Sequence, residues 1–288
     1  MANYCTNCGT KLEDTWKFCP FCSNHIYHRP EEPFQISEKK RLTKRQKIAI
    51  IIGTVVIISA IIIPIGSILT YQYLFPQKTL PFYVNNGNTL TSYTVSTTRT
   101  TLTFFENQPH PSHTYMDPNH TAQVVESYCT PYDESIIQIA QAIRSECIDQ
   151  YDSEEVINAL LSFTQAVGYK VDPIDLAQYP LETIFHQGDC EDLSILFGSL
   201  VVSLGFEAII VVINYYDVGE GQWFGHACIG VYLDFTPTQH SGYPPSYSFN
   251  VNSKNYWVCE TTYQGWMIGE LPTASPSYYI MEAYSFID

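Results

Sequence analysis

The sequence predicts an α+β fold that follows a small cysteine-rich segment and one long apolar helix. Three observations support this prediction. Two CxxC pairs occupy the first 25 residues, an uncharged apolar run fills 48–69, and amphipathic helices followed by apolar strands fill the second half of the chain. A chain of 288 residues has room for one or two domains beside the apolar helix.

The cysteine-rich segment reads YCTNCGTKLEDTWKFCPFCSNH at 4–25. Its two pairs are Cys5 with Cys8 and Cys19 with Cys22, and four thiolates spaced in this way hold Zn²⁺ tetrahedrally. The segment resembles the short zinc ribbons that precede membrane spans in prokaryotic proteins. A redox role for either pair is the alternative, but no βαβ pattern surrounds them. We expect a structural zinc ribbon that serves interaction or regulation.

The apolar run predicts a membrane-spanning helix, because about 20 apolar residues cross the hydrocarbon layer. A buried soluble helix and a cleaved signal peptide are the alternatives; the run is long for the first and lacks an A-x-A site for the second. Six of the nine residues at 39–47 are basic, and such flanks stay in the cytoplasm. We therefore expect a cytoplasmic N-terminus and an extracytoplasmic segment 75–288.

The charge is distributed unevenly along the chain. Residues 1–47 hold nine Lys/Arg and five Asp/Glu, whereas the part after residue 76 holds five against twenty-four. A strongly acidic C-terminal part argues against nucleic acid as its partner. The segment 72–132 is rich in Thr, Ser and Tyr. It is expected to form either a stalk or a β-rich segment, with strands within 89–106.

Helical periodicity follows at 133–147, at 152–168 and again after residue 189. In the last of these, Asp189 is the expected N-cap, with Asp192 three residues later. Cys190 then opens a buried helix, where the N–H groups and the helix dipole are expected to lower the thiol pKa.

Three strands are expected next, at 207–214, 225–235 and 255–263. The second begins close to His226, and the third carries Glu260 near its end. A cysteine, a histidine and an acid in this order are the residue types that a thiolate–imidazolium pair with a third, orienting group requires.

These stretches resemble the transglutaminase-like superfamily, whose core has a papain-like catalytic arrangement. The resemblance covers about 133–272 and rests on YPLETIFHQGDCEDLSILFGSLVVSLGFEAIIVV, GHACIGVYL and YWVCETTY. It implies that Cys190 is the nucleophile, His226 the general base and Glu260 the acid that orients the imidazole. One departure is that the third residue is usually Asp, often followed by Pro-Thr, whereas this chain has Glu260-Thr261.

Three carboxylates surround Cys190 and should oppose formation of its thiolate. Asp189 is expected to cap the helix, and Glu191 and Asp192 either point away or help to bind a cation such as Ca²⁺. Bacterial cysteine proteinases that this chain resembles share a Gly-Asp-Cys-Glu-Asp run and are calcium-dependent. The resemblance therefore implies the Ca²⁺ alternative.

Five cysteines follow the apolar run, so at least one must lie outside any disulfide. Cys129 and Cys147 are candidates for a pair, because disulfides persist outside the cytoplasm. Cys190 is expected to keep its thiol.

The sequence therefore predicts a papain-like or transglutaminase-like α+β core behind a zinc ribbon and one transmembrane helix. The expected activity is hydrolysis of a peptide or amide through a Cys190 thioester. A protein-crosslinking transglutaminase and an inactive surface binding module are the alternatives. The expected partners are the membrane, an outer protein or peptide substrate, and an unidentified cytoplasmic partner of the ribbon. The expected parts are a zinc ribbon at 1–28, a basic linker at 29–47, a transmembrane helix at 48–71, a stalk or β-rich segment at 72–132 and a transglutaminase-like domain at 133–288.

Overall fold

The part of the chain that the computed structural model describes comprises residues 43–85, 87–110, 118–171, 176–217, 221–242, 247–271 and 281–287, with Lys11 and Cys22. Three of the four expected zinc ligands, Cys5, Cys8 and Cys19, lie outside the described residues. Contacts divide the chain into two compact units, Met1–Ile62 and Ile63–Asp288, and each is considered by itself.

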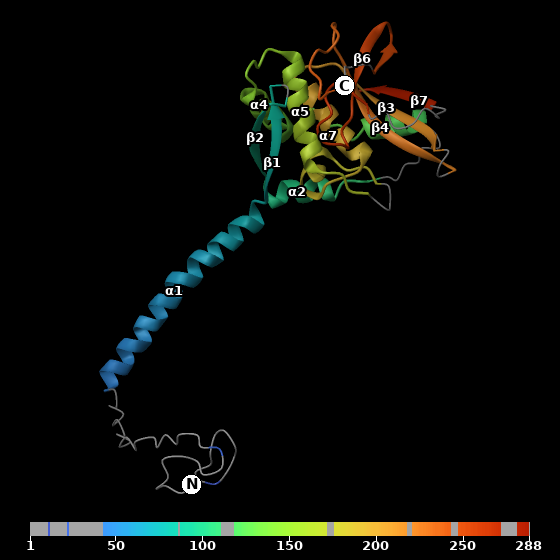
Figure 1. Cartoon of the computed structure of the whole chain (residues 1–288). Helices are drawn as coiled ribbons and strands as arrows, with labels where there is room; N and C mark the ends of the chain where they lie inside the picture. The colour runs from blue at the N-terminus through green and yellow to red at the C-terminus, as the bar shows by residue number, and fades with distance from the viewer. Residues whose placement is uncertain are drawn as a thin grey trace. The chain divides into compact units, whose positions relative to one another are not determined.

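The apolar run forms one long helix, α1 (Lys44–Leu74), drawn in blue in Figure 1. Its stretch Val56–Leu74 has a mean hydropathy of 1.7 and none of it is buried. By length and composition this helix can cross a membrane, as the sequence predicts.

A β-hairpin follows α1 after two residues. Strand β1 (Gln77–Val84) pairs antiparallel with β2 (Thr89–Ser96). Side chains along β1 alternate between buried and exposed, and the buried Phe82 packs edge-on against Phe163 with ring centroids 6.0 Å apart. Strands therefore occupy most of 77–96, in the part of the chain for which a stalk or a β-rich segment was expected.

Helix α2 (Arg99–Glu106) replaces the second half of the strand region expected at 89–106. The Thr98 hydroxyl accepts from the Thr101 N–H and caps the helix, and Leu102 and Phe105 are buried three residues apart. Capping and helical spacing thus outweigh the β preference of the threonines. Helix α3 (Pro118–Glu126) packs on two strands of the main sheet, β3 (Ala208–Asp217) and β7 (Met281–Phe286).

Four further helices form the interior of the domain. Helix α4 (Glu134–Glu146) and α5 (Ser153–Val167) match the expected periodicity, and each is capped by an aspartate whose Oδ1 accepts two backbone N–H groups. The short α6 (Pro180–His186) leads into α7 (Cys190–Ser203). Helix α7 contacts α4 and α5 on one side and strands β3 and β4 (Gln222–Tyr232) on the other, so nearly all of it is buried (Figure 1).

The main sheet has five antiparallel strands in the order β5-β6-β4-β3-β7. Their bounds are β3 Ala208–Asp217, β4 Gln222–Tyr232, β5 Ser248–Val251, β6 Lys254–Cys259 and β7 Met281–Phe286. Mixed α+β architecture with antiparallel sheets is therefore confirmed. Two expectations need correction: His226 lies inside β4 opposite Ile213 rather than at its start, and Glu260 directly follows β6 instead of lying on it.

The expected pairing of Cys129 with Cys147 is wrong. The Cys129 thiol faces the Ile195 carbonyl at 3.9 Å, and the Cys147 thiol faces the Ile143 carbonyl at 3.6 Å. Each sulfur is turned into a different part of the helical layer, so the two do not meet.

The buried ring of Phe82 connects the hairpin to α5, and its loss should destabilise the whole domain. We expect Phe82→Ala to lower the free energy of unfolding by about 3–5 kcal/mol, through lost burial and the cavity left behind. Tyr83→Ala, at the next and 47% exposed position, should cost less than about 1 kcal/mol. Denaturant unfolding of both variants tests this; equal, small losses would mean that the hairpin behaves as a detached stalk.

Candidate active site

Cys190 is the first residue of α7 and is 8% exposed. Asp189 before it has an extended backbone, and its carbonyl accepts the first helical bond from the Leu193 N–H at 3.1 Å. The expectation that Asp189 is the N-cap and that Cys190 begins the helix agrees with this geometry. The thiol therefore lies at the end of the helix where N–H groups have no intrahelical acceptor.

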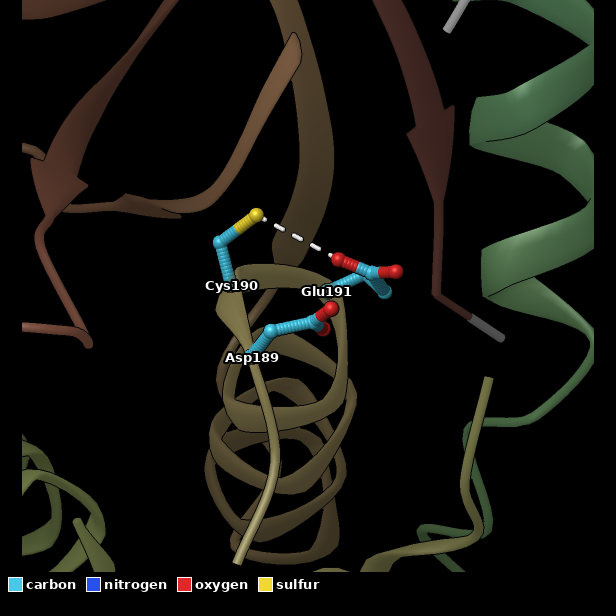
Figure 2. A group of neighbouring side chains, drawn as sticks. All are labelled: Asp189, Cys190 and Glu191. Atoms are coloured by element: carbon cyan, nitrogen blue, oxygen red, sulfur yellow. Dashed lines mark hydrogen bonds between the residues drawn. The ribbon is translucent and has the colours of Figure 1, made fainter. Parts of the chain in front are cut away.

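The neighbour of the thiol is a carboxylate. The Cys190 thiol donates to Glu191 Oε2 at 3.3 Å, and Figure 2 shows the two side chains turned toward one another above the helix end. Glu191 is 1% exposed. The expectation that Glu191 points away from the thiol is therefore wrong. A carboxylate in this place favours the protonated thiol, because it accepts a hydrogen bond from the thiol and would repel a thiolate.

The Asp192 side chain links the first turn of α7 to Gln178 and Asp189, which precede the nucleophile. Its carboxylate accepts from the Gln178 backbone N–H at 2.6 Å, from Gln178 Nε2 at 2.8 Å and from the Asp189 N–H at 3.3 Å. Gln178 Nε2 also donates to the Gln187 carbonyl at 3.0 Å. Gly188 lies so close that a Cβ built on it would be 2.3 Å from Asp192 Cβ, so a larger residue does not fit.

The calcium hypothesis gains no support. Ligand atoms of Asp189, Cys190 and Glu191 lie within 4.8 Å of one another, but Asp192, the third expected carboxylate, is not part of this group. Its oxygens instead accept the three N–H groups that hold the loop.

Ser194 connects α7 to the residues that follow His226 and Glu260. It lies four residues, or one helical turn, after Cys190. Its hydroxyl donates to the carbonyl of Ala227 at 3.2 Å and lies 3.4 Å from the Thr261 hydroxyl. Ala227 follows His226 and Thr261 follows Glu260, so these contacts bring the chain next to both residues against the first turns of α7.

His226 and Glu260 form a hydrogen-bonded ion pair. The His226 Nε2 and Glu260 Oε2 atoms are 2.8 Å apart, and the glutamate is 2% exposed. Glu260 Oε1 accepts from the backbone N–H and the hydroxyl of Thr262 at 2.8 and 2.6 Å. Because His226 Nε2 is hydrogen-bonded to the glutamate, Nδ1 is the ring nitrogen that is left to accept a proton from a thiol.

Opposite charges stabilise each member of this pair. Burial alone would lower the pKa of His226, but the adjacent Glu260 and the nearby Glu191 raise it above its usual value. Burial would raise the pKa of Glu260, yet His226 and the Thr262 donors hold it below its usual value. The imidazolium–carboxylate pair therefore contributes stability from about pH 4.5 to above about pH 6.5. Glu191 is a shared neighbour of the Cys190 thiol and the His226 ring.

Sequence reasoning missed Gln178, which lies in the chain before α6 and reaches Asp192 across 14 residues. No periodicity marks it, because it belongs to no helix or strand. The Gln187 side-chain amide donates to the Val167 carbonyl at 3.2 Å. The prediction that the Cys190 sulfur and the His226 ring meet directly stays a prediction.

Comparisons with known proteins identify the N-terminal segment. A zinc-ribbon domain model matches residues 4–26, which confirms the predicted ribbon. A search of curated proteins finds no match. One solved structure, from Cytophaga hutchinsonii and provisionally named a cysteine protease, is similar over 74% of this chain and 76% of its own, with 14% identity and a TM-score of 0.32. A similarity this low carries no argument about fold or activity.

The buried Asp192 should give the domain an unusual pH response. Burial, with a contribution from Glu191, raises its pKa from 3.8 to about 7 despite the three N–H donors. Between these two pH values the folded state keeps a proton that the unfolded state has lost, so rising pH lowers the free energy of unfolding. We expect the stability of the wild type relative to Asp192→Asn to fall by more than about 1.4 kcal/mol, the equivalent of one pKa unit, from pH 4 to pH 7.5.

Denaturant unfolding at a series of pH values measures this difference. Ser145→Ala, an exposed change without a titrating group, is the control and should show no trend with pH. A difference between the wild type and Asp192→Asn that rises with pH would contradict the assignment.

Proposed function

We propose that the protein is a membrane-anchored cysteine hydrolase of transglutaminase-like, papain-like type, which acts on a peptide or amide outside the cytoplasm. The observation that carries this proposal is the His226–Glu260 ion pair, because the residues after its two members, Ala227 and Thr261, contact Ser194 one helical turn after Cys190. Cys190 is assigned as nucleophile, His226 as general base and Glu260 as the acid that orients the imidazole.

The proposed reaction begins when His226 Nδ1 takes the thiol proton and the sulfur attacks the acyl carbon. The C–S bond forms as the carbonyl π pair moves to oxygen, and helix N–H groups at Cys190 stabilise that charge. The oxygen pair returns, the C–N bond breaks, and the imidazolium gives its proton to the leaving amine. Water, deprotonated by His226, then attacks the thioester; the acid leaves and the thiol is restored.

Two alternatives share the fold and differ at the acceptor or at the nucleophile. In a crosslinking transglutaminase, a lysine amine replaces water in the second half of the reaction. In a surface binding module, the cysteine is inert. The thiol–Glu191 bond favours the inert form as the resting state, because a carboxylate opposes thiolate formation. The ion pair between His226 and Glu260 favours an active enzyme, because it stabilises the imidazolium that pairs with a thiolate.

Thiol labelling separates the enzyme from the binding module. In the full chain we expect iodoacetamide to alkylate Cys190 at neutral pH at least about tenfold faster than Cys129. Burial raises the pKa of the Cys129 thiol to about 12, so this cysteine serves as an internal reference. Peptide mapping by mass spectrometry gives both rates.

Two variants test whether His226 and Glu260 are responsible for fast alkylation of Cys190. His226→Ala should slow labelling of Cys190 at least about tenfold, because it removes the imidazolium. Glu260→Gln should lie between this variant and the wild type, because it keeps the ring and weakens its charge. Equal rates in the wild type and His226→Ala would leave the protein as a binding module.

The proposed topology places the N-terminus in the cytoplasm and residues 75–288 outside. It rests on the basic residues before α1 and on the length of that helix. We expect a membrane-impermeant maleimide to label Tyr132→Cys on intact expressing cells, because Tyr132 is 75% exposed. Lys44→Cys, at the start of α1, should react only after permeabilisation; the opposite pattern would reverse the orientation.

The ribbon is proposed to hold one structural Zn²⁺ through Cys5, Cys8, Cys19 and Cys22 and to serve a cytoplasmic partner. Four thiolates in two CxxC pairs fit this metal, and a segment this short has too small a core to fold without it. Elemental analysis of the purified chain should give one equivalent of zinc. Cys19→Ser should remove it and Cys129→Ser should retain it; zinc retained in Cys19→Ser would refute the ligand set.

A further inference from the structure

The proposed reaction has an electrostatic difficulty. Negative charge develops on the acyl oxygen next to Asp189, Cys190 and Glu191, and the two carboxylates repel it. The helix N-terminus offsets part of this repulsion. Oxyanion sites in general use at least two donors, and a neutral O–H or N–H group suits an acidic environment.

Tyr169 is held in fixed register with the loop that carries the nucleophile. Tyr169 forms a parallel bridge with Gly188, two residues before Cys190, and the Lys170 N–H donates to the Gly188 carbonyl at 2.8 Å. The preceding Gly168 has a φ of +93°, and a Cβ on it would be 2.8 Å from Gln187 Nε2. These contacts allow the segment before Tyr169 to lie directly against the loop.

The Tyr169 side chain is half exposed and is coupled electrostatically to the residues around Cys190. Tyr169 is 49% exposed, and its phenol interacts electrostatically with Cys190, Asp189 and Glu191, and also with Tyr263. Burial and these negative neighbours raise the pKa of the Tyr169 phenol to about 12. The group therefore stays protonated at neutral pH and can donate a hydrogen bond.

We propose that Tyr169 is a catalytic residue whose hydroxyl donates to the acyl oxygen of the substrate on Cys190, as the second donor beside the helix N–H groups. This assignment rests on the proposed function. The Gln187 amide instead donates to the Val167 carbonyl and so holds the loop in place. Removal of the hydroxyl should weaken every adduct in which the oxygen carries charge, and leave the thiol itself unchanged.

Two reagents that use the same sulfur separate these effects. Iodoacetamide forms a C–S bond with loss of iodide and puts no charge on oxygen. The second reagent is N-acetylglycinal, a peptide aldehyde without a side chain. The sulfur adds to its carbonyl carbon, and the charge that develops on the aldehyde oxygen needs hydrogen-bond donors. The experiment measures the rate of Cys190 alkylation in the full chain in detergent, with increasing aldehyde as the protecting reagent.

The expected result is specific to one hydroxyl. Tyr169→Phe should raise the aldehyde concentration that halves the alkylation rate at least about tenfold, and should change the rate without aldehyde less than about twofold. Tyr263→Phe makes the same chemical change at a 60% exposed tyrosine near Tyr169 and should match the wild type in both.

Four results would overturn the assignment. Equal protection of the wild type and Tyr169→Phe, or no protection of the wild type, rejects the second donor while leaving Cys190 as the nucleophile. A large change in the alkylation rate without aldehyde would mean that Tyr169 contacts the resting thiol instead. If Cys190 of the wild type does not react with iodoacetamide, the proposed function fails, and the role of Tyr169 fails with it.

Discussion

The hydrogen bonds of Asp192 are the constraint on which the rest of the site depends. One buried carboxylate ties the Gln178 segment and the Asp189 backbone to the first turn of α7, and Gly188 leaves room for it. Because Cys190 lies between two of the joined residues, its position follows from these bonds. The cost is a carboxylate kept out of water, which three N–H donors offset in part.

The same use of acidic residues recurs through the domain. Glu154 accepts from the Thr238 and Gln239 N–H groups at 2.6 and 2.5 Å, and Glu270 accepts from those of Ser241 and Met267 at 2.7 and 2.8 Å. These carboxylates are nearly fully buried and hold loops that have no regular structure. The large negative charge of the C-terminal part thus serves in part to satisfy backbone donors, a role that composition alone does not reveal.

The sequence predicted what depends on local spacing. Helices α4, α5 and the start of α7 follow from apolar periodicity and aspartate caps, and each begins where the pattern places it. Helix α2 was not predicted, because its threonine-rich segment satisfies both helical and strand patterns. The position of Glu191 against the thiol depends on side-chain direction within one helical turn, and no spacing specifies it.

The short connection between α1 and β1 has a consequence for how substrates are reached. Only Phe75 and Pro76 separate the helix from the hairpin, a span of at most about 7 Å. With α1 in the bilayer, as proposed, the domain cannot sample the volume that a long flexible tether would allow. Its encounters would be confined to a thin layer along the membrane, so substrates that share that layer would meet it by two-dimensional diffusion, at a high effective concentration.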